Sequence, residues 1–216
     1  MNIIFIGPPG AGKGTQAEKI VSGFGLPHIS TGDAFRLAMS QGTPMGVKAK
    51  DYVDRGLLVP DDITIGIVKE RIQLDDCKDG FLLDGFPRTL VQAEALDEIM
   101  KSMDDKIDHV INLSVNRGFL MDRLTGRWIC KSCGATYHIT NNPPLQEGIC
   151  DKCTGSLYQR SDDTEEKVGT RLDEYSNKTA PLLQYYEDKR LLRQINGEQE
   201  IDAVTLQIAT FLRGQA

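Results

Sequence analysis

Short apolar runs alternate along this chain with stretches in which apolar residues recur every three or four positions. The runs are typical of buried strands, and the recurrence is typical of amphipathic helices. We predict strands within residues 3–6, 28–29, 81–83, 109–113 and 191–195. We predict helices that carry the apolar positions of residues 17–24, 35–39, 63–68, 93–100, 116–125 and 204–212. This order predicts an α/β fold in which helices cover both faces of a mostly parallel sheet.

Polar and glycine-rich positions add detail to this pattern. Thr31 and Asp61 each precede a helical pattern, so we expect them to be N-caps. Residues 42–60 are polar and contain glycine and proline, and we expect a small helical excursion from the core there. Residues 126–163 lose the apolar periodicity and contain four of the five cysteines. We expect an inserted unit that cannot build its own hydrophobic core.

The cysteines of that insert form two pairs of the type Cys-x-x-Cys. Cys130 and Cys133 are followed, after 16 residues, by Cys150 and Cys153. This spacing is typical of a four-cysteine zinc site, in which four thiolates surround one tetrahedral ion and leave no position for water. Such a zinc would be structural. Two disulfides or free thiols are the alternatives, and we expect Cys77 to be a plain, partly buried residue.

Residues 7–15 form a glycine-rich segment between the first predicted strand and the first predicted helix. In that context glycines let backbone N–H groups approach a polyphosphate, and the helix N-terminus favours the same negative charge. Lys13 can reach the outer phosphate oxygens. Gly14 follows Lys13 where the general pattern has Ser or Thr, and the hydroxyl comes at Thr15. A structural glycine-rich turn is the alternative interpretation.

Asp84 ends the predicted strand at residues 81–83. Ligands of open parallel sheets bind at the carboxyl ends of the strands, so this carboxylate is a candidate to hold Mg²⁺ beside a nucleotide. A turn or helix-capping aspartate is the alternative.

The overall charge limits the class of partner. The 216 residues carry a formal net charge of −6 and are 40% hydrophobic, which allows a sizeable core and argues against nucleic acid as the main partner. No apolar stretch approaches the length of a membrane span, and the N-terminus does not resemble a secretory signal. We therefore expect a cytoplasmic protein that does not bind a membrane.

Arginines are the candidates for a second phosphate site. Each is a surface residue by default, and Arg123 and Arg127 would share one helix face if the helix extends that far. Two nucleotide phosphate groups carry about six negative charges, of which Mg²⁺ offsets two. Without Lys13 and six arginines the chain has 18 basic against 31 acidic residues. We therefore predict one basic cleft in an otherwise acidic protein, formed by Lys13 with Arg36, Arg88, Arg123, Arg127, Arg160 and Arg171.

Several motifs occur in a fixed order after the glycine-rich loop. They are Thr31-Gly32-Asp33, Asp84-Gly85-Phe86-Pro87-Arg88, Thr125-Gly126-Arg127 and Tyr158-Gln159-Arg160. With these motifs the chain closely resembles, from end to end, the bacterial adenylate kinases of the long-lid form with a zinc-binding lid. The resemblance implies a phosphate-loop kinase core with a central five-stranded parallel sheet and two mobile inserted subdomains. It places the core at residues 1–29, 60–125 and 164–216, an AMP-binding subdomain at 30–59 and the zinc-binding lid at 126–163.

The resemblance also implies roles for individual residues. ATP would contact Gly10, Ala11, Gly12, Lys13, Gly14, Thr15, Arg127, Thr136, Tyr137 and Gln199. AMP would contact Thr31, Arg36, Leu57, Leu58, Val59, Gly85, Phe86, Pro87, Arg88, Gln92, Arg160 and Arg171. Arg123 would face the phosphates, and Arg160 and Arg171 would reach both substrates as the lid closes. Trp128 departs from many relatives, which have a basic residue there, and Cys153 completes a four-cysteine site where some relatives have Asp.

The implied reaction is ATP + AMP ⇌ 2 ADP, with Mg²⁺ bound to ATP and a structural Zn²⁺ in the lid of a monomer. It needs no general base, because the AMP phosphate is already ionised near neutral pH. This agrees with the three histidines, His28, His109 and His138, which show no catalytic spacing and are expected to be structural. A kinase for UMP or CMP is the nearest alternative, although Thr31 and Gln92 favour adenine. A zinc-ribbon module that binds nucleic acid is a more distant one.

Overall fold

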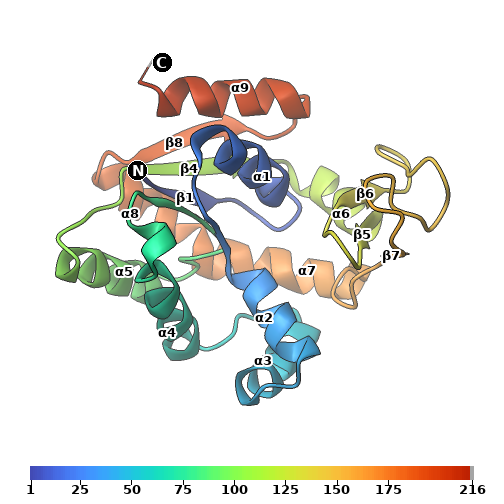
Figure 1. Cartoon of the computed structure of the whole chain (residues 1–216), viewed down its shortest axis with the longest axis horizontal. Coiled ribbons are helices and arrows are strands. Elements are labelled where there is room, and N and C mark those ends of the chain that lie inside the picture. Colours follow the sequence, from blue (N-terminus) through green and yellow to red (C-terminus); the bar gives the residue numbers. More distant parts are fainter. Residues whose placement is uncertain (215–216) are drawn as a thin grey trace.

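The computed structural model describes residues 1–214 and has a parallel five-stranded sheet at its centre (Figure 1). The strand order is β2-β3-β1-β4-β8, and every neighbouring pair is parallel. The strands are β1 (Asn2–Ile6), β2 (His28–Ser30), β3 (Phe81–Asp84), β4 (His109–Ser114) and β8 (Leu192–Asn196). The predicted α/β class with a central five-stranded sheet is confirmed.

Helices cover both faces of this sheet, with α1 and α9 on one side of it and α4 and α5 on the other (Figure 1). In the described residues they are α1 (Lys13–Phe24), α2 (Thr31–Ser40), α3 (Pro44–Asp54), α4 (Asp61–Ile72), α5 (Leu90–Ser102), α6 (Arg117–Thr125), α7 (Glu165–Glu174), α8 (Pro181–Asp188) and α9 (Ile201–Leu212). A short 3-10 turn, η1, spans Asp75–Cys77, and a π turn, η2, spans Tyr175–Thr179.

The strands separate two apolar clusters because successive side chains point to opposite faces. Along β1, Ile4 and Ile6 belong to the cluster that packs against α4, α5 and α8. Ile3 and Phe5 belong to the cluster that packs against α1, α6, α7 and α9. Burial on both faces explains why β1 is apolar along its length apart from Asn2.

The central position of β1 decides where a ligand can bind. β1 pairs with β3 on one side and with β4 on the other, so the chain connections diverge at its carboxyl end. Such a switch point leaves a crevice at that edge of the sheet. The glycine-rich loop leaves β1 at this point.

A second, antiparallel sheet lies beside the main one and contains β5 (Arg127–Cys130), β6 (Thr136–His138) and β7 (Leu157–Tyr158) (Figure 1). Its interior holds Cys130, Ala135, Tyr137, Cys150 and Leu157, with Trp128 packed against them. The expectation that this segment has no hydrophobic core was therefore wrong. The core is small, however, and two of its five buried members are cysteines.

The segment between β2 and β3 contains the predicted excursion, which is α3. Phe35, Ala49 and Val59 form a separate apolar cluster there. Helices α2 and α3 approach so closely that a Cβ on Gly46 would lie 2.1 Å from the carbonyl oxygen of Ala38.

Both predicted N-caps are wrong by one residue. Ser30 caps α2, because its hydroxyl accepts a hydrogen bond from the backbone N–H of Asp33. Thr31 is the first helical residue, and its hydroxyl donates to the carbonyl of Gly85. Pro60 precedes α4, so Asp61 lies inside the helix and is free to bind other groups.

Helices α7 and α8 were not predicted. Each buries only two side chains four residues apart, Val168 and Leu172 on α7 and Leu182 and Tyr186 on α8. That signal is weak beside the many charges around it. Two glutamates in the first turn of α7 agree with a helix N-terminus and could have supported the prediction.

Candidate functional site

A cavity of about 780 Å³ lies at the carboxyl edge of the central sheet. Its walls come from the loop after β1, from α2, from the turn after β3, from the small sheet and from the loop after β8. All the residues expected to contact nucleotide line it except Phe86. The Phe86 side chain is fully buried in the apolar core, so only its backbone is available to a ligand.

The glycine-rich loop positions Lys13 at this cavity. Gly10 and Gly12 have φ angles of 85° and 91°, which side chains rarely tolerate, and α1 begins directly after Gly12. The Lys13 ammonium donates to the carbonyls of Gly7 and Pro8 at 2.7 and 3.0 Å. Burial lowers the pKa of Lys13 to about 8; Asp84 opposes the shift, and the nearby arginines add to it. Lys13 is therefore a cation in a site that favours an anion as its partner.

Asp84 lies at the end of β3, beside Lys13. His28 Nε2 is 3.5 Å from Asp84 Oδ2, so this histidine has a polar partner that its spacing did not reveal. Burial opposes ionisation of Asp84, but His28 and Lys13 outweigh it and lower the pKa below its usual range. A single ionised carboxylate suits Mg²⁺, which is commonly held by one or two carboxylates and keeps several waters.

The six candidate arginines line the same cavity as Lys13. The expected shared helix face of Arg123 and Arg127 is wrong, because α6 ends at Thr125 and Arg127 begins β5. Arg123 instead donates to the carbonyl of Gly197, in the loop after β8. Burial is the main cause that lowers the pKa values of Arg88 and Arg160 to about 10, and neighbouring arginines add to the shift.

Three aspartates that the sequence analysis missed bind these arginines. Asp163 accepts from Arg127 at 2.9 and 2.5 Å and from Arg171 at 3.0 Å. Asp162 lies 3.1 Å from Arg171, and Asp33 accepts from Arg36 at 2.5 Å. Asp33 and Arg36 are three residues apart on α2, a helical spacing that was available as a signal. No such spacing connects Asp163 with Arg127. The adjacent pair Asp162-Asp163, at the end of the cysteine-containing segment, was the available signal.

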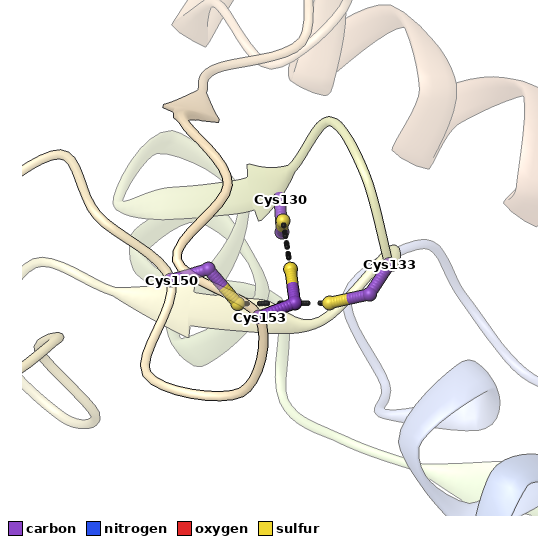
Figure 2. Close-up of side chains that lie close together, drawn as sticks. All are labelled: Cys130, Cys133, Cys150 and Cys153. Carbon is purple, nitrogen blue, oxygen red and sulfur yellow. Dashed lines mark hydrogen bonds between the residues drawn. The ribbon is translucent and has the colours of Figure 1, made fainter.

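The four cysteine sulfurs converge, as Figure 2 shows. Cys130 and Cys153 have their Sγ atoms 3.4 Å apart, Cys133 and Cys150 have theirs 3.6 Å apart, and all four lie within 4.8 Å of one another. A disulfide would need about 2.05 Å. Zinc–sulfur bonds of about 2.3 Å give a tetrahedron with edges of about 3.8 Å, so the donor set fits zinc.

Outer contacts orient these sulfurs. The Tyr137 hydroxyl lies 3.3 Å from Cys150 Sγ and the Ser132 N–H donates to Cys130 Sγ at 3.4 Å, as second contacts commonly do around metal ligands. Cys77, by contrast, is buried in the main core, where Arg71 Nη1 donates to its sulfur at 3.0 Å.

Sequence comparison identifies the family of the chain. A family model described as adenylate kinase matches residues 5–191. The chain belongs to the adenylate kinase family. It is 59% identical to the adenylate kinase of Geobacillus sp. (strain WCH70) over 99% of both chains. It is 58% identical to those of Bacillus licheniformis, over 100% of this chain and 99% of that one, and Bacillus cereus (strain B4264), over the full length of both.

Two glutamines of this adenylate kinase, Gln92 and Gln199, line the cavity. The Gln92 amide contacts the backbone N–H of Arg88 and the carboxylate of Asp61. The Gln199 amide donates to the carbonyl of Asn196 at 3.4 Å and accepts from Gln207 at 2.7 Å. Both amides are thus held by neighbours.

His138 packs against Gly126, the residue that connects the end of α6 to the start of β5. We call this connection the joint. A Cβ on Gly126 would lie 2.4 Å from His138 Nε2. The ring bridges two elements, since Nε2 lies 3.0 Å from the carbonyl oxygen of Asp122 and Nδ1 accepts from the N–H groups of Thr140 and Asn141. His138 therefore ties β6 to the end of α6. Among residues 1–214, no helix has both the length and the apolar character needed to cross a membrane.

Proposed function

We propose that this adenylate kinase transfers the terminal phosphoryl group of MgATP reversibly to AMP and forms two ADP. The main support is that Lys13 and six arginines line one cavity at the switch point of the sheet. A single nucleotide would not need so many cations, whereas ATP and AMP together bring about six negative charges. A complete cavity within one chain supports a monomer as the active species.

The phosphate loop and Lys13 would hold the ATP phosphates, with Arg127, Thr136 and Tyr137 above them and Gln199 near the adenine. Backbone N–H groups at the start of α1 are directed toward anions, as in other sites of this kind. The AMP site would use Thr31, Arg36, Arg88, Gln92 and residues 57–59 and 85–87. The two phosphates would then meet in line above Lys13.

For this reaction the protein mainly has to align the two phosphates and stabilise the negative charge of the transferring group. The attacking AMP phosphate has a second pKa of about 6, so it is ionised near neutral pH without a base. Arginine forks can hold two phosphate oxygens at once and stabilise the charge of the transferring group. Arg160 and Arg171 would serve both substrates, and Arg171 would exchange its aspartate partners for phosphate.

Two metals complete the proposal. Asp84 would hold Mg²⁺, directly or through water, and the ion would offset the negative charge of the phosphates. Cys130, Cys133, Cys150 and Cys153 would hold a structural Zn²⁺ that keeps residues 126–163 a rigid lid. Closure of this lid and of residues 30–59 over the core would exclude water, the competing acceptor. Thiols that stay unpaired favour a reducing compartment such as the cytoplasm.

A coupled assay of ADP formation tests the reaction. Lys13→Ala and Arg88→Ala should each lower kcat by about 10²-fold or more while the far-UV circular dichroism stays native, because each removes a preorganised charge from the transfer site. Arg55→Ala is the matched control, since Arg55 is an exposed arginine outside the cavity. It should keep turnover within about twofold, as surface changes usually do.

An acceptor panel tests the substrate. AMP should be the best acceptor among AMP, UMP, CMP and GMP at equal MgATP. A higher kcat/KM for UMP or CMP would replace the proposal with a pyrimidine monophosphate kinase. Near-normal turnover of Lys13→Ala or Arg88→Ala would refute the role given to that residue.

A further inference from the structure

Gln92 is almost completely buried, with 1% of the residue exposed, yet it lines the cavity. The amide oxygen accepts a hydrogen bond from the backbone N–H of Arg88 at 2.7 Å. The amide nitrogen donates to Asp61 Oδ1, also at 2.7 Å. Each end of the amide therefore already has one short contact with the protein.

These two contacts determine which way the amide faces. A carboxylate only accepts hydrogen bonds, and a backbone N–H only donates one. A flipped Gln92 would bring its oxygen against the Asp61 carboxylate and its NH₂ group against the Arg88 N–H. Both hydrogen bonds would become repulsive contacts in a buried place, where an unsatisfied polar group is costly.

Asp61 is itself fixed by its neighbours. It is the first residue of α4, where a negative charge is favoured by the helix. The Thr89 hydroxyl donates to the same Asp61 oxygen at 3.1 Å. Thr89 also caps α5 by accepting the backbone N–H of Gln92 at 3.2 Å. Thr89 therefore ties Asp61 to the start of the helix that carries Gln92.

The hydrogen-bond inventory of the amide shows what remains for a ligand. A primary amide has two donor hydrogens and two acceptor sites. Asp61 takes one donor and the Arg88 N–H takes one acceptor site, so one of each remains. Adenine presents an N6–H donor next to the N1 acceptor, which matches such an amide. Hypoxanthine has nearly the same shape but presents the O6 acceptor next to the N1–H donor, which requires the flipped amide.

We propose that Asp61 is the positioning residue that sets the base specificity of the acceptor site, by fixing the orientation of the Gln92 amide. This inference rests on the proposed function, in which Gln92 faces the base of the acceptor nucleotide. Asp61 touches no reacting atom in this scheme. It acts through Gln92, and its effect is discrimination between bases of reversed polarity.

The test replaces Asp61 by asparagine, whose side chain can either donate or accept at that position. In D61N the flipped Gln92 amide regains a partner at residue 61, and only its contact with the Arg88 N–H still opposes the flip, so kcat/KM for IMP should rise relative to AMP. We expect the AMP:IMP ratio of kcat/KM to fall at least tenfold. CMP carries its N4–H donor and N3 acceptor in the same order as adenine, so the AMP:CMP ratio should stay within about threefold of the parent value.

The control is D62N, which removes the same charge from an exposed residue of the same helical turn. It should leave both ratios unchanged. A fall of less than tenfold in the AMP:IMP ratio of D61N, or an equal fall in AMP:CMP, would overturn the proposal. If D61N does not fold, D61S serves in its place, because a serine hydroxyl can also donate or accept.

A second experiment tests whether Asp61 acts through Gln92 or through an unrelated effect on the enzyme. In Q92L the amide is absent, so adding D61N should not change the AMP:IMP ratio further, which a double-mutant cycle measures. A further change in that background would show that Asp61 acts independently of Gln92 and would overturn the proposal. The AMP turnover of the parent enzyme tests the proposed function separately from the role of Asp61. If it fails to phosphorylate AMP the proposed function fails, whereas normal AMP turnover with an unchanged D61N ratio refutes this inference alone.

Discussion

At the scale of a residue, the buried carboxylate of Asp163 connects two distant segments of the chain. Its side chain is fully buried, and it accepts hydrogen bonds from Arg127 on β5 and from Arg171 on α7. The two arginines come from segments that are far apart in the sequence. Asp163 therefore joins the small sheet to the core, and its one negative charge is shared by two cations.

We predict that Asp163→Ala lowers the free energy of unfolding by about 3–5 kcal/mol, because it leaves two closely placed arginines without their buried partner. Urea denaturation followed by circular dichroism measures this. Asp173→Ala is the control, since Asp173 binds Arg117 through an exposed ion pair, and such pairs contribute about 1 kcal/mol or less. Similar losses in the two variants would contradict the role given to Asp163.

At the scale of elements, the contact between α2 and α3 depends on the absence of one side chain. Gly46 lies in the first turn of α3, with the carbonyl of Ala38 above it. Because backbone atoms cannot move aside as a flexible side chain can, a methyl group there would push the two helices apart. Gly66, in the middle of α4, has no atom within 4 Å of the position of a Cβ.

These two glycines make a matched pair. Gly46→Ala should destabilise the protein by about 1–3 kcal/mol through overpacking. Gly66→Ala should stabilise it by about 0.5–1 kcal/mol, since alanine favours a helix interior and meets no neighbour. Midpoints of urea unfolding give both values. A neutral Gly46→Ala would mean that the helices separate without cost, contrary to the packing described.

At the scale of the whole molecule, the chain consists of a large core and a small unit with a weak interior of its own. The small unit buries few apolar side chains, and its cysteines supply part of that interior. Trp128 packs against this cluster and is the sole tryptophan of the chain. Its fluorescence therefore reports on the small unit, whereas far-UV circular dichroism reports mainly on the helices of the core.

We predict one zinc per chain by metal analysis. When a strong chelator removes the zinc, the melting temperature measured by Trp128 fluorescence should fall. The melting temperature measured by far-UV circular dichroism should fall less, because the large apolar clusters do not contain the cysteines of the zinc site. Cys77→Ala should keep the zinc content, since Cys77 is outside the cluster. Absence of zinc together with no effect of the chelator would refute the zinc proposal.

The positions of the five central strands and of most helices along the chain could be predicted, because burial on one or two faces leaves a local, periodic pattern in the sequence. Val168 and Leu172 were too few to reveal α7 among charged neighbours. Glycine and lysine spacing located the phosphate loop, since its function depends on consecutive backbone positions. The partners of the arginines could not be located in this way, because Asp163 and Arg127 meet only after the small sheet has folded back onto the core.

The close approach of His138 to Gly126 restricts which substitutions residue 126 can tolerate. A methyl group at residue 126 would collide with an imidazole that three backbone groups hold in place. A side chain at residue 126 in this joint therefore requires the His138 ring to move, which would break its bridge to α6. A substitution at residue 126 should accordingly be tolerated better when His138 is replaced as well.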